Sequence, residues 1–151
     1  MSTPASGGHD SLCAPYKLEF PFERTVGPKI GTFFAGLKEK RLFGVRARRG
    51  VLCPPLEFDP DSGAETGELV ELPTTGTVTT WTWVRSRPDD PVSHDFAWAL
   101  VEIDGTAGSL FHAVDVGGDP TRMTRGMRVR VRWRDERVGD LRDIECFEVE
   151  R

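Results

Sequence analysis

The stretch TVTTWTWV, Thr77–Val84, sets the fold class of this chain. Its β-branched and aromatic residues favour an extended strand. Because side chains alternate across a strand, Trp81 and Trp83 lie on one face, opposite the intervening Thr82. We expect one face to line the interior of a barrel, and the other to be covered by a helix, a partner protein or a stacked nucleobase. Packing or a protein interface is the favoured alternative, since tryptophan is frequent at interfaces.

Further strands follow this one at regular intervals, separated by Gly, Pro and Asp. Such a pattern is typical of a sandwich or a small barrel. About five strands after residue 75, the first of them long, best match a five-stranded Greek-key barrel of the oligonucleotide/oligosaccharide-binding (OB) type. The fold class is therefore expected to be mainly β. The expected strands are approximately 69–72, 77–84, 96–103, 109–114, 127–134 and 141–149.

A helix is expected before the barrel, over residues 28–40. Gly27-Pro28 marks its start, because proline is preset for the first helical turn. Ile30, Phe33, Phe34 and Leu37 then recur at helical spacing. This apolar stripe must pack either on its own domain or on a partner subunit, which makes Phe33 and Phe34 candidate partner contacts.

The strand RVRVRWR, residues 128–134, alternates arginine with apolar residues. Val129, Val131 and Trp133 should line the barrel, and the four arginines should face outward. The arginine face is either a solvated surface balanced by acidic neighbours, or a site for coenzyme A phosphates, a nucleic-acid strand or an acidic partner. The candidate partner or acyl-CoA contacts of this chain are Phe33, Phe34, Trp81, Trp83, Arg122, Arg125, Arg128 and Arg130.

Between helix and barrel, the stretch RARRGVLCPPLEFDPDSG, Arg46–Gly63, has the outline of a small zinc ribbon. Two tight turns enclose a short apolar strand and a Pro-Pro. A zinc ribbon needs a pair of cysteines at each turn, but the single cysteine here, Cys53, is in neither turn. VRA and VLC on either side of Arg48-Arg49-Gly50 indicate a hairpin.

Composition and charge narrow the classes of function. The chain has 151 residues, 38% hydrophobic and 29% charged, with a formal net charge of −4. Phosphate binding is driven by basic charge, so nucleic acid is a disfavoured partner. No apolar run of about 18 residues is present, so no membrane span is expected. The expected organisation is a disordered leader over 1–20, a helical segment over 21–43, a ribbon-like module over 44–74 and the barrel over 75–151.

The cysteine pattern favours a reducing cytoplasm. Cys13, Cys53 and Cys146 are odd in number, far apart and without CxxC spacing, so no disulfide framework is expected. A catalytic pair of cysteine and histidine is weighed against the more frequent role of a lone cysteine as a small buried hydrophobe, which we favour. The histidines in question are His9, His94 and His112.

The motifs of common active sites are missing from the sequence. It contains no HExxH, GxSxG, Walker or GxGxxG motif. His94 and Asp95 are neighbours and would point to opposite faces of a strand, as would His112 and Asp115. We therefore expect no catalytic residues, and structural roles for both histidines.

These parts together resemble a family of thiolase-associated proteins with a rubredoxin-like zinc ribbon and an OB-type barrel, long described as a domain of unknown function. The resemblance runs from about residue 21 to 148. It is carried by the order and spacing of GTFFAGLKEKRLFGVRARRGVLCPP, DPDSG, GTVTTWTWV, FAWALVEIDG, LFHAVDV and RGMRVRVRW. The version here is most similar to the subgroup that partners sterol-carrier-type thiolase-like aldolases in steroid side-chain degradation.

The resemblance aligns four residues with the cysteines of the family's ribbon. Arg46 and Arg49 stand at the first pair, and Asp59 and Ser62 at the second. Guanidinium groups cannot ligate a cation, so zinc is not expected, and no other cofactor is implied. We expect an ion pair from Arg46 or Arg49 to Asp59 to hold the two turns together instead.

The resemblance also implies a function. Members look like non-catalytic subunits bound to thiolase-like enzymes that act on acyl-CoA. The expected role is an accessory subunit that stabilises an aldolase during retro-aldol cleavage of a β-hydroxyacyl-CoA, in a cytoplasmic heterotetramer with two copies of each subunit. The alternatives are a single-stranded nucleic-acid-binding module, or an acyl-CoA-binding protein acting with another thiolase-type enzyme.

Overall fold

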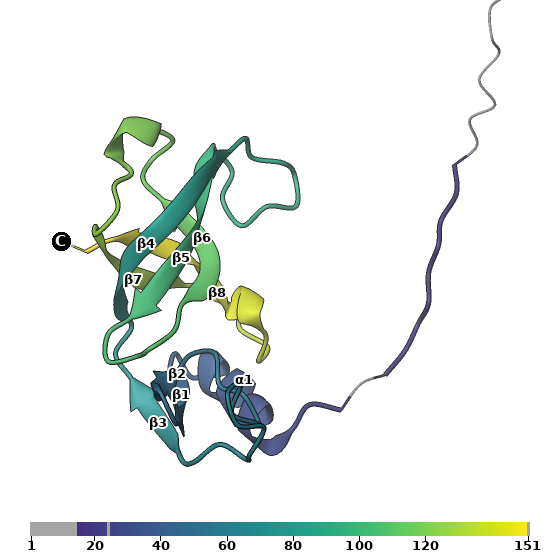
Figure 1. Cartoon of the computed structure of the whole chain (residues 1–151). Coiled ribbons are helices and arrows are strands. Elements are labelled where there is room, and N and C mark those ends of the chain that lie inside the picture. The colour runs from purple at the N-terminus through teal and green to yellow at the C-terminus, as the bar shows by residue number, and fades with distance from the viewer. Residues whose placement is uncertain (1–14, 24, 151) are drawn as a thin grey trace, which may run out of the picture.

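Five strands close into a barrel in the computed structural model of the chain, which describes residues 15–23 and 25–150 (Figure 1). Their order around the barrel is β4-β5-β6-β8-β7, and β7 pairs with β4 to close it. This closed barrel confirms the expected mainly β fold class of OB type. The strands are β4 (Thr75–Val84), β5 (Phe96–Ile103), β6 (Leu110–Asp115), β7 (Arg128–Trp133) and β8 (Ile144–Val149).

The barrel interior is filled by side chains that alternate along the strands. Val129 and Val131 of β7 point inward, as expected, and are buried. Phe147 of β8, the cross-strand partner of Val131, is fully buried in the same core cluster. This burial of alternate apolar residues is the main source of stability for a barrel of this size.

The last strand begins later than the sequence pattern predicts. A short 3₁₀ helix, η2 (Leu141–Asp143), occupies the start of the segment expected to be strand. Asp140 and Asp143 form a capping box there, and Asp143 also accepts the backbone N–H groups of Val138 and Gly139 at 2.9 and 2.7 Å. Side-chain capping of this kind favours a helical turn over a strand. A second 3₁₀ turn, η1 (Pro120–Arg122), connects β6 to β7.

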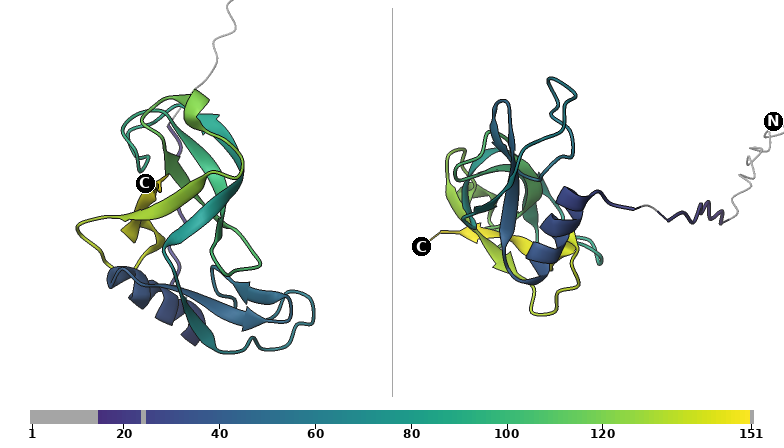
Figure 2. Two further views of the ribbon diagram at one scale, coloured as in Figure 1. Left: turned by 90° about the vertical axis from the view of Figure 1, so that its left-hand side faces the viewer. Right: turned by 90° about the horizontal axis from the view of Figure 1, so that it is seen from below.

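The helix and a small sheet lie below the barrel in Figure 1. The helix α1 spans Pro28–Lys38, two residues shorter than expected. The sheet has the order β2-β1-β3 and contains the expected hairpin. Figure 2 shows the helix lying across this sheet and reaching the barrel. The strands are β1 (Leu42–Ala47), β2 (Gly50–Leu52) and β3 (Leu69–Leu72).

The apolar stripe of α1 packs within the chain. Phe33 and Leu37 are buried in the same core cluster as the barrel residues. At the C-terminal end, the guanidinium of Arg137 donates to the carbonyl of Lys38 at 2.8 Å and ties the helix to the β7–β8 loop. The sequence left open whether the helix packs on its own domain or on a partner subunit. In the structure its apolar stripe packs on its own domain.

Part of the predicted leader lies outside the described residues, as do His9 and Cys13. In the described range, no helix is long and apolar enough to cross a membrane.

Candidate interaction surface on the barrel

The outward arginines of β7 are paired with carboxylates of neighbouring segments. The guanidinium of Arg128 donates to both oxygens of Asp104 at 2.5 and 2.6 Å, and to Glu150 at 2.9 Å. Arg130 donates twice to Glu148, at 2.9 and 2.8 Å. The hydrogen bonds from Arg128 and Thr75 lower the pKa of Asp104 to about 2. Of these carboxylates, Glu148 belongs to β8, while Asp104 directly follows β5 and Glu150 directly follows β8.

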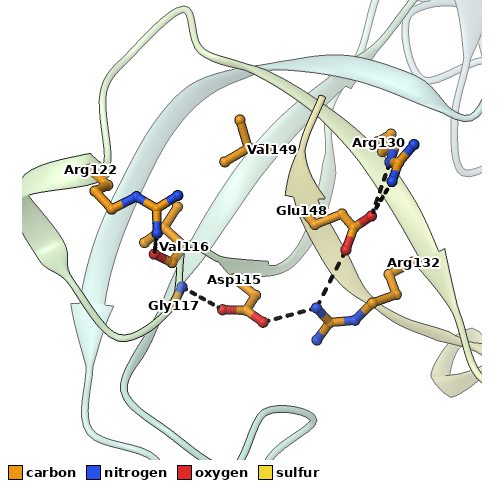
Figure 3. A pocket seen from close by; sticks show the side chains of 8 residues that line it. All are labelled: Asp115, Val116, Gly117, Arg122, Arg130, Arg132, Glu148 and Val149. Atoms are coloured by element: carbon orange, nitrogen blue, oxygen red, sulfur yellow. Dashed lines mark hydrogen bonds and ion pairs between the residues drawn. The ribbon is translucent and has the colours of Figure 1, made fainter. Parts of the chain in front are cut away.

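A hollow of about 370 Å³ lies beside the ion pair of Arg130 and Glu148 (Figure 3). At its floor Asp115 accepts from the Nη1 of Arg132 at 2.9 Å and from the backbone N–H of Gly117 at 2.8 Å. Three arginines face two carboxylates, so the hollow carries a small positive balance. Its lining residues are Asp115, Val116, Gly117, Arg122, Arg130, Arg132, Glu148 and Val149.

Asp115 is also the partner of a histidine that sequence reasoning did not pair with it. His94 is in the loop between β4 and β5, and its Nε2 lies 2.7 Å from Oδ1 of Asp115 at the end of β6. Burial alone would raise the pKa of Asp115, but hydrogen bonds from Gly117, His94 and Arg132 outweigh it and lower the pKa. The carboxylate of Asp115 is thus held ionised at the centre of a hydrogen-bond network, and this favours a structural role for Asp115 and His94.

Arg122 and Arg125 differ from the arginines of β7. Arg122 donates to the carbonyl of Val116 at 2.6 Å, and Arg125 donates to the carbonyl of Thr79 at 2.8 Å. In the described part of the chain, neither forms an ion pair. Their positive charges are therefore not neutralised by a contacting carboxylate, and of the four arginines predicted as contacts they are the two best suited to an anionic group or an acidic partner.

The two turns of the ribbon-like module are joined by a single carboxylate. Oδ2 of Asp59 accepts the backbone N–H of Arg48 at 2.7 Å, and its Oδ1 accepts the N–H groups of Asp61 and Ser62 at 2.9 and 3.0 Å. The hydrogen bond from the Arg48 backbone is the main cause that lowers the pKa of Asp59 to about 2. Asp59 itself is buried, with 5% of its surface exposed.

The predicted ion pair from Arg46 or Arg49 to Asp59 is wrong. The side chain of Arg49 contacts Asp61 instead, at 2.6 Å, and Arg46 is exposed. A carboxylate that already accepts several N–H groups is satisfied by the backbone and needs no guanidinium partner. The clip between the turns is therefore a carboxylate-to-backbone contact.

The residues at the four ribbon positions do not fit a zinc ion. Arg46 and Arg49 offer no ligand atom, and the oxygens of Asp59 are engaged by N–H donors. Across residues 15–23 and 25–150, no three metal-ligating side chains gather at one point. Structural zinc requires four such ligands.

The predicted aromatic contacts lie largely inside the molecule. Phe33 is 2% exposed and belongs to the core, so its side chain presents no surface to a partner. Phe34, Trp81 and Trp83 are half-buried and pack against the same cluster. The tryptophans of β4 therefore pack against the barrel core and keep part of their surface exposed, so their contact with a partner stays a prediction.

A different aromatic pair faces outward. Trp98 of β5 is stacked on Phe111 of β6, with ring centroids 5.3 Å apart and an angle of 19°. Phe111 is 57% exposed. Together with Leu141 and Ile144, the two rings line a mainly apolar hollow of about 360 Å³ between the β4–β5 and β7–β8 loops. The pair depends on the register between β5 and β6, which alternation within one strand does not give.

The described cysteines are not activated nucleophiles. Burial raises the pKa of Cys53 and of Cys146 to about 12, which keeps both as thiols. His112 is buried, and burial lowers its pKa to about 4, so that it is neutral. Its Nδ1 accepts the backbone N–H of Ala113 at 2.9 Å, as expected for a structural histidine.

Comparison with known proteins agrees with this architecture. Residues 69–134 match the family model described as ChsH2, C-terminal OB-fold domain. The chain is also similar to a chain of the Ltp2-ChsH2(DUF35) aldolase, with 24% identity and a TM-score of 0.58, over 84% of this chain and 98% of that one. These matches confirm the predicted resemblance to the DUF35 family.

A second similar structure is a Sulfolobus solfataricus protein from the DUF35 family, described as having unknown function. It shares 15% identity at a TM-score of 0.61, over 82% of this chain and 87% of that one. At such identities the likeness shows a common fold. No curated protein sequence matches the chain.

Proposed function

We propose that this chain, whose residues 69–134 match the family model of the ChsH2 C-terminal OB-fold domain, is the non-catalytic subunit of a thiolase-like aldolase. The family match of the barrel is the observation that carries the proposal. The likeness to a chain of the Ltp2-ChsH2(DUF35) aldolase over most of both chains supports it. In this role the chain binds and stabilises the subunit that performs the chemistry.

The chemistry of the described residues supports a non-catalytic role. Retro-aldol cleavage needs a base that removes a proton from the β-hydroxyl group, and a group that stabilises the departing enolate. His112 is buried and hydrogen-bonded to the backbone, and both described thiols are kept protonated. His94 is engaged with Asp115. We therefore assign the proton transfers to the partner.

The substrate proposed for the complex is a β-hydroxyacyl-CoA that carries a steroid side chain. Two copies of this chain are proposed to bind a dimer of the catalytic subunit. Arg122 and Arg125 are the residues of this chain that we assign to an anionic contact, either with the CoA phosphates or with acidic residues of the partner.

A reconstitution assay tests the proposed function. The chain and a thiolase-like subunit from the same organism are purified separately and together, and cleavage of a β-hydroxyacyl-CoA is followed by the appearance of the aldehyde or ketone product. We expect turnover by the pair and none by this chain alone. Turnover by the isolated chain, or a catalytic subunit that is equally active and stable without it, would contradict the proposal.

A further inference from the structure

A run of exposed apolar side chains precedes α1. We call residues 15–23, PYKLEFPFE, the arm. Tyr16, Leu18, Phe20 and Phe22 are 83%, 63%, 74% and 81% exposed. Figure 1 and the right-hand view of Figure 2 show the arm extending away from the barrel and the small sheet. Single exposed apolar residues are ordinary, but several together mark an interaction site.

The arm has the alternation of a β-strand with one apolar face. Its polar residues occupy the odd positions between the apolar ones. The Nζ of Lys17 lies 2.5 Å from the Oε1 of Glu19, as expected for side chains two residues apart on the same face of an extended chain. An alternating pattern of this kind is typical of a strand that buries one face. In the described structure the arm has no neighbouring strand.

Two prolines determine which edge of the arm can pair. In a strand the N–H and C=O groups of one residue point to one side, and those of the next residue to the other. Pro15 and Pro21 are both at odd positions, so the odd side lacks two N–H donors. The even side keeps all its donors, and these belong to the residues with the apolar side chains. The residues that can pair without interruption are therefore the ones that carry the apolar side chains.

This chain offers no strand edge long enough for the arm within the described residues. The barrel is closed, but β7 covers only the start of β4, so residues 79–84 of β4 keep an unpaired edge of six residues, which is shorter than the arm. The outer strands of the small sheet are β2 and β3, with three and four residues. Both are shorter than the seven residues from Tyr16 to Phe22. A second copy of the chain has the same short edges, so the arm fits a partner of another kind.

We propose that the arm is a docking strand for the thiolase-like subunit. It adds to an exposed strand edge of that subunit, and its apolar side chains enter a groove beside the edge. This inference rests on the proposed function, because the partner is the catalytic subunit named there. The contact surface continues onto this chain's body at the start of α1.

The side chain of Glu57 binds the N-terminal end of α1, the helix that follows the arm. Its Oε1 accepts the backbone N–H of Lys29 at 2.9 Å, in the first turn of α1. Leu56 and Phe58 flank Glu57 in the chain and are 39% and 60% exposed. Val26, which is 54% exposed, lies just before α1. Exposed apolar side chains are thus present near the start of α1, beyond those of the arm itself.

Affinity measurements with full-length variants test the inference. The double variant Phe20→Ser/Phe22→Ser removes two apolar anchors, and Lys17→Ser/Glu19→Ser changes the opposite face as a matched control. Binding of each to the purified thiolase-like subunit is measured by surface plasmon resonance. We expect the first variant to bind at least about tenfold more weakly than wild type, since buried aromatic anchors dominate interfaces. The control should bind like wild type, and both should keep the wild-type melting temperature.

The outcomes separate this inference from the proposed function. If wild type binds and Phe20→Ser/Phe22→Ser binds equally well, the arm is not the docking strand, while the proposed function stands. If wild type does not bind at all, both are overturned. Sedimentation of the chain alone is the further check: self-association that the double variant abolishes would make a second copy the occupant and would overturn the inference.

Discussion

At the scale of single residues, Asp59 shows how the ribbon-like frame persists without metal ligands. Its carboxylate crosses from one turn to the other and accepts the N–H of Arg48, while it also organises its own turn. This is the geometry that a metal would otherwise impose by binding both turns. A buried carboxylate that accepts several N–H groups is difficult to replace, because every donor would be left unpaired.

Replacement of Asp59 by alanine should destabilise the protein. The N–H groups of Arg48, Asp61 and Ser62 would lose their acceptor. We expect the melting temperature of Asp59→Ala to fall by several degrees in calorimetry. Asp61→Ala is the matched control, because it removes an exposed ion pair with Arg49 that contributes little. Equal melting temperatures for the two variants would contradict the role assigned to Asp59.

The same carboxylate predicts a loss of stability in acid. The pKa of Asp59 is lowered from 3.8 to about 2, so the unfolded state binds the proton more readily than the folded state. Its contribution is complete above about pH 4 and is lost as the pH falls through about 2. Denaturant unfolding at pH 5, 3 and 2 should show a smaller decline for Asp59→Asn than for wild type. A parallel decline would indicate that other carboxylates, such as Asp104, carry the effect.

Residue-level sequence reasoning missed three contacts for a common reason. The acceptor role of Asp59 depends on backbone N–H groups, whose directions no residue pattern reveals. His94 meets Asp115 because the β4–β5 loop returns to the barrel. Trp98 meets Phe111 through the pairing of β5 with β6. Each contact requires the positions of segments distant in sequence.

At the scale of elements, the strands were predictable because alternation and turn residues are local signals. The limits of β3 and β5 agree with the expected ranges, and the inward valines of β7 were assigned correctly. The start of β8 was not, because the capping box of Asp140 and Asp143 forms a 3₁₀ turn there. The packing of α1 on the chain's own body could not be predicted, since an amphipathic helix fits any apolar surface.

The ion pairs of the outward β7 arginines, Arg128, Arg130 and Arg132, which we call the arginine ladder, should contribute to the stability of the barrel. In Arg128→Glu the new carboxylate would face Asp104 and Glu150, and repulsion would replace two contacts at the β4–β7–β8 seam. We expect a melting temperature several degrees below that of wild type, and an intermediate value for Arg128→Gln. Arg125→Glu is the control, because in the described structure Arg125 contacts a carbonyl oxygen and no carboxylate. If Arg125→Glu were the less stable of the two, the ladder would not have this role.

At the scale of the whole molecule, the chain combines a closed barrel with a small sheet, a helix and an exposed arm. The barrel is closed, and the outward arginines of β7 are largely neutralised by its own carboxylates. The surfaces left for a partner are Arg122 and Arg125, the outward aromatic pair and the apolar side chains of the arm. This distribution suits a protein that binds another protein through several separate patches.

The resemblance to the thiolase-associated family was visible in the order of the sequence motifs. The surface that binds a partner could not be identified from the sequence in the same way. Period-two and period-3.6 patterns give the elements and their inward faces, since burial produces those patterns. A partner that is absent from the folded chain leaves its mark as exposed apolar residues, such as Tyr16 and Phe22. Such residues stand out only when the exposed fraction of each side chain is known.

The native mass of the complex tests the central claim most directly. The tagged chain is purified from its own host at moderate salt, and the intact assembly is weighed by native mass spectrometry while its 260/280 nm absorbance ratio is recorded. We predict a thiolase-like protein in equal amount, a mass equal to two copies of each subunit, and no nucleic acid. A chain that elutes alone, or together with nucleic acid, would contradict its role as an aldolase subunit.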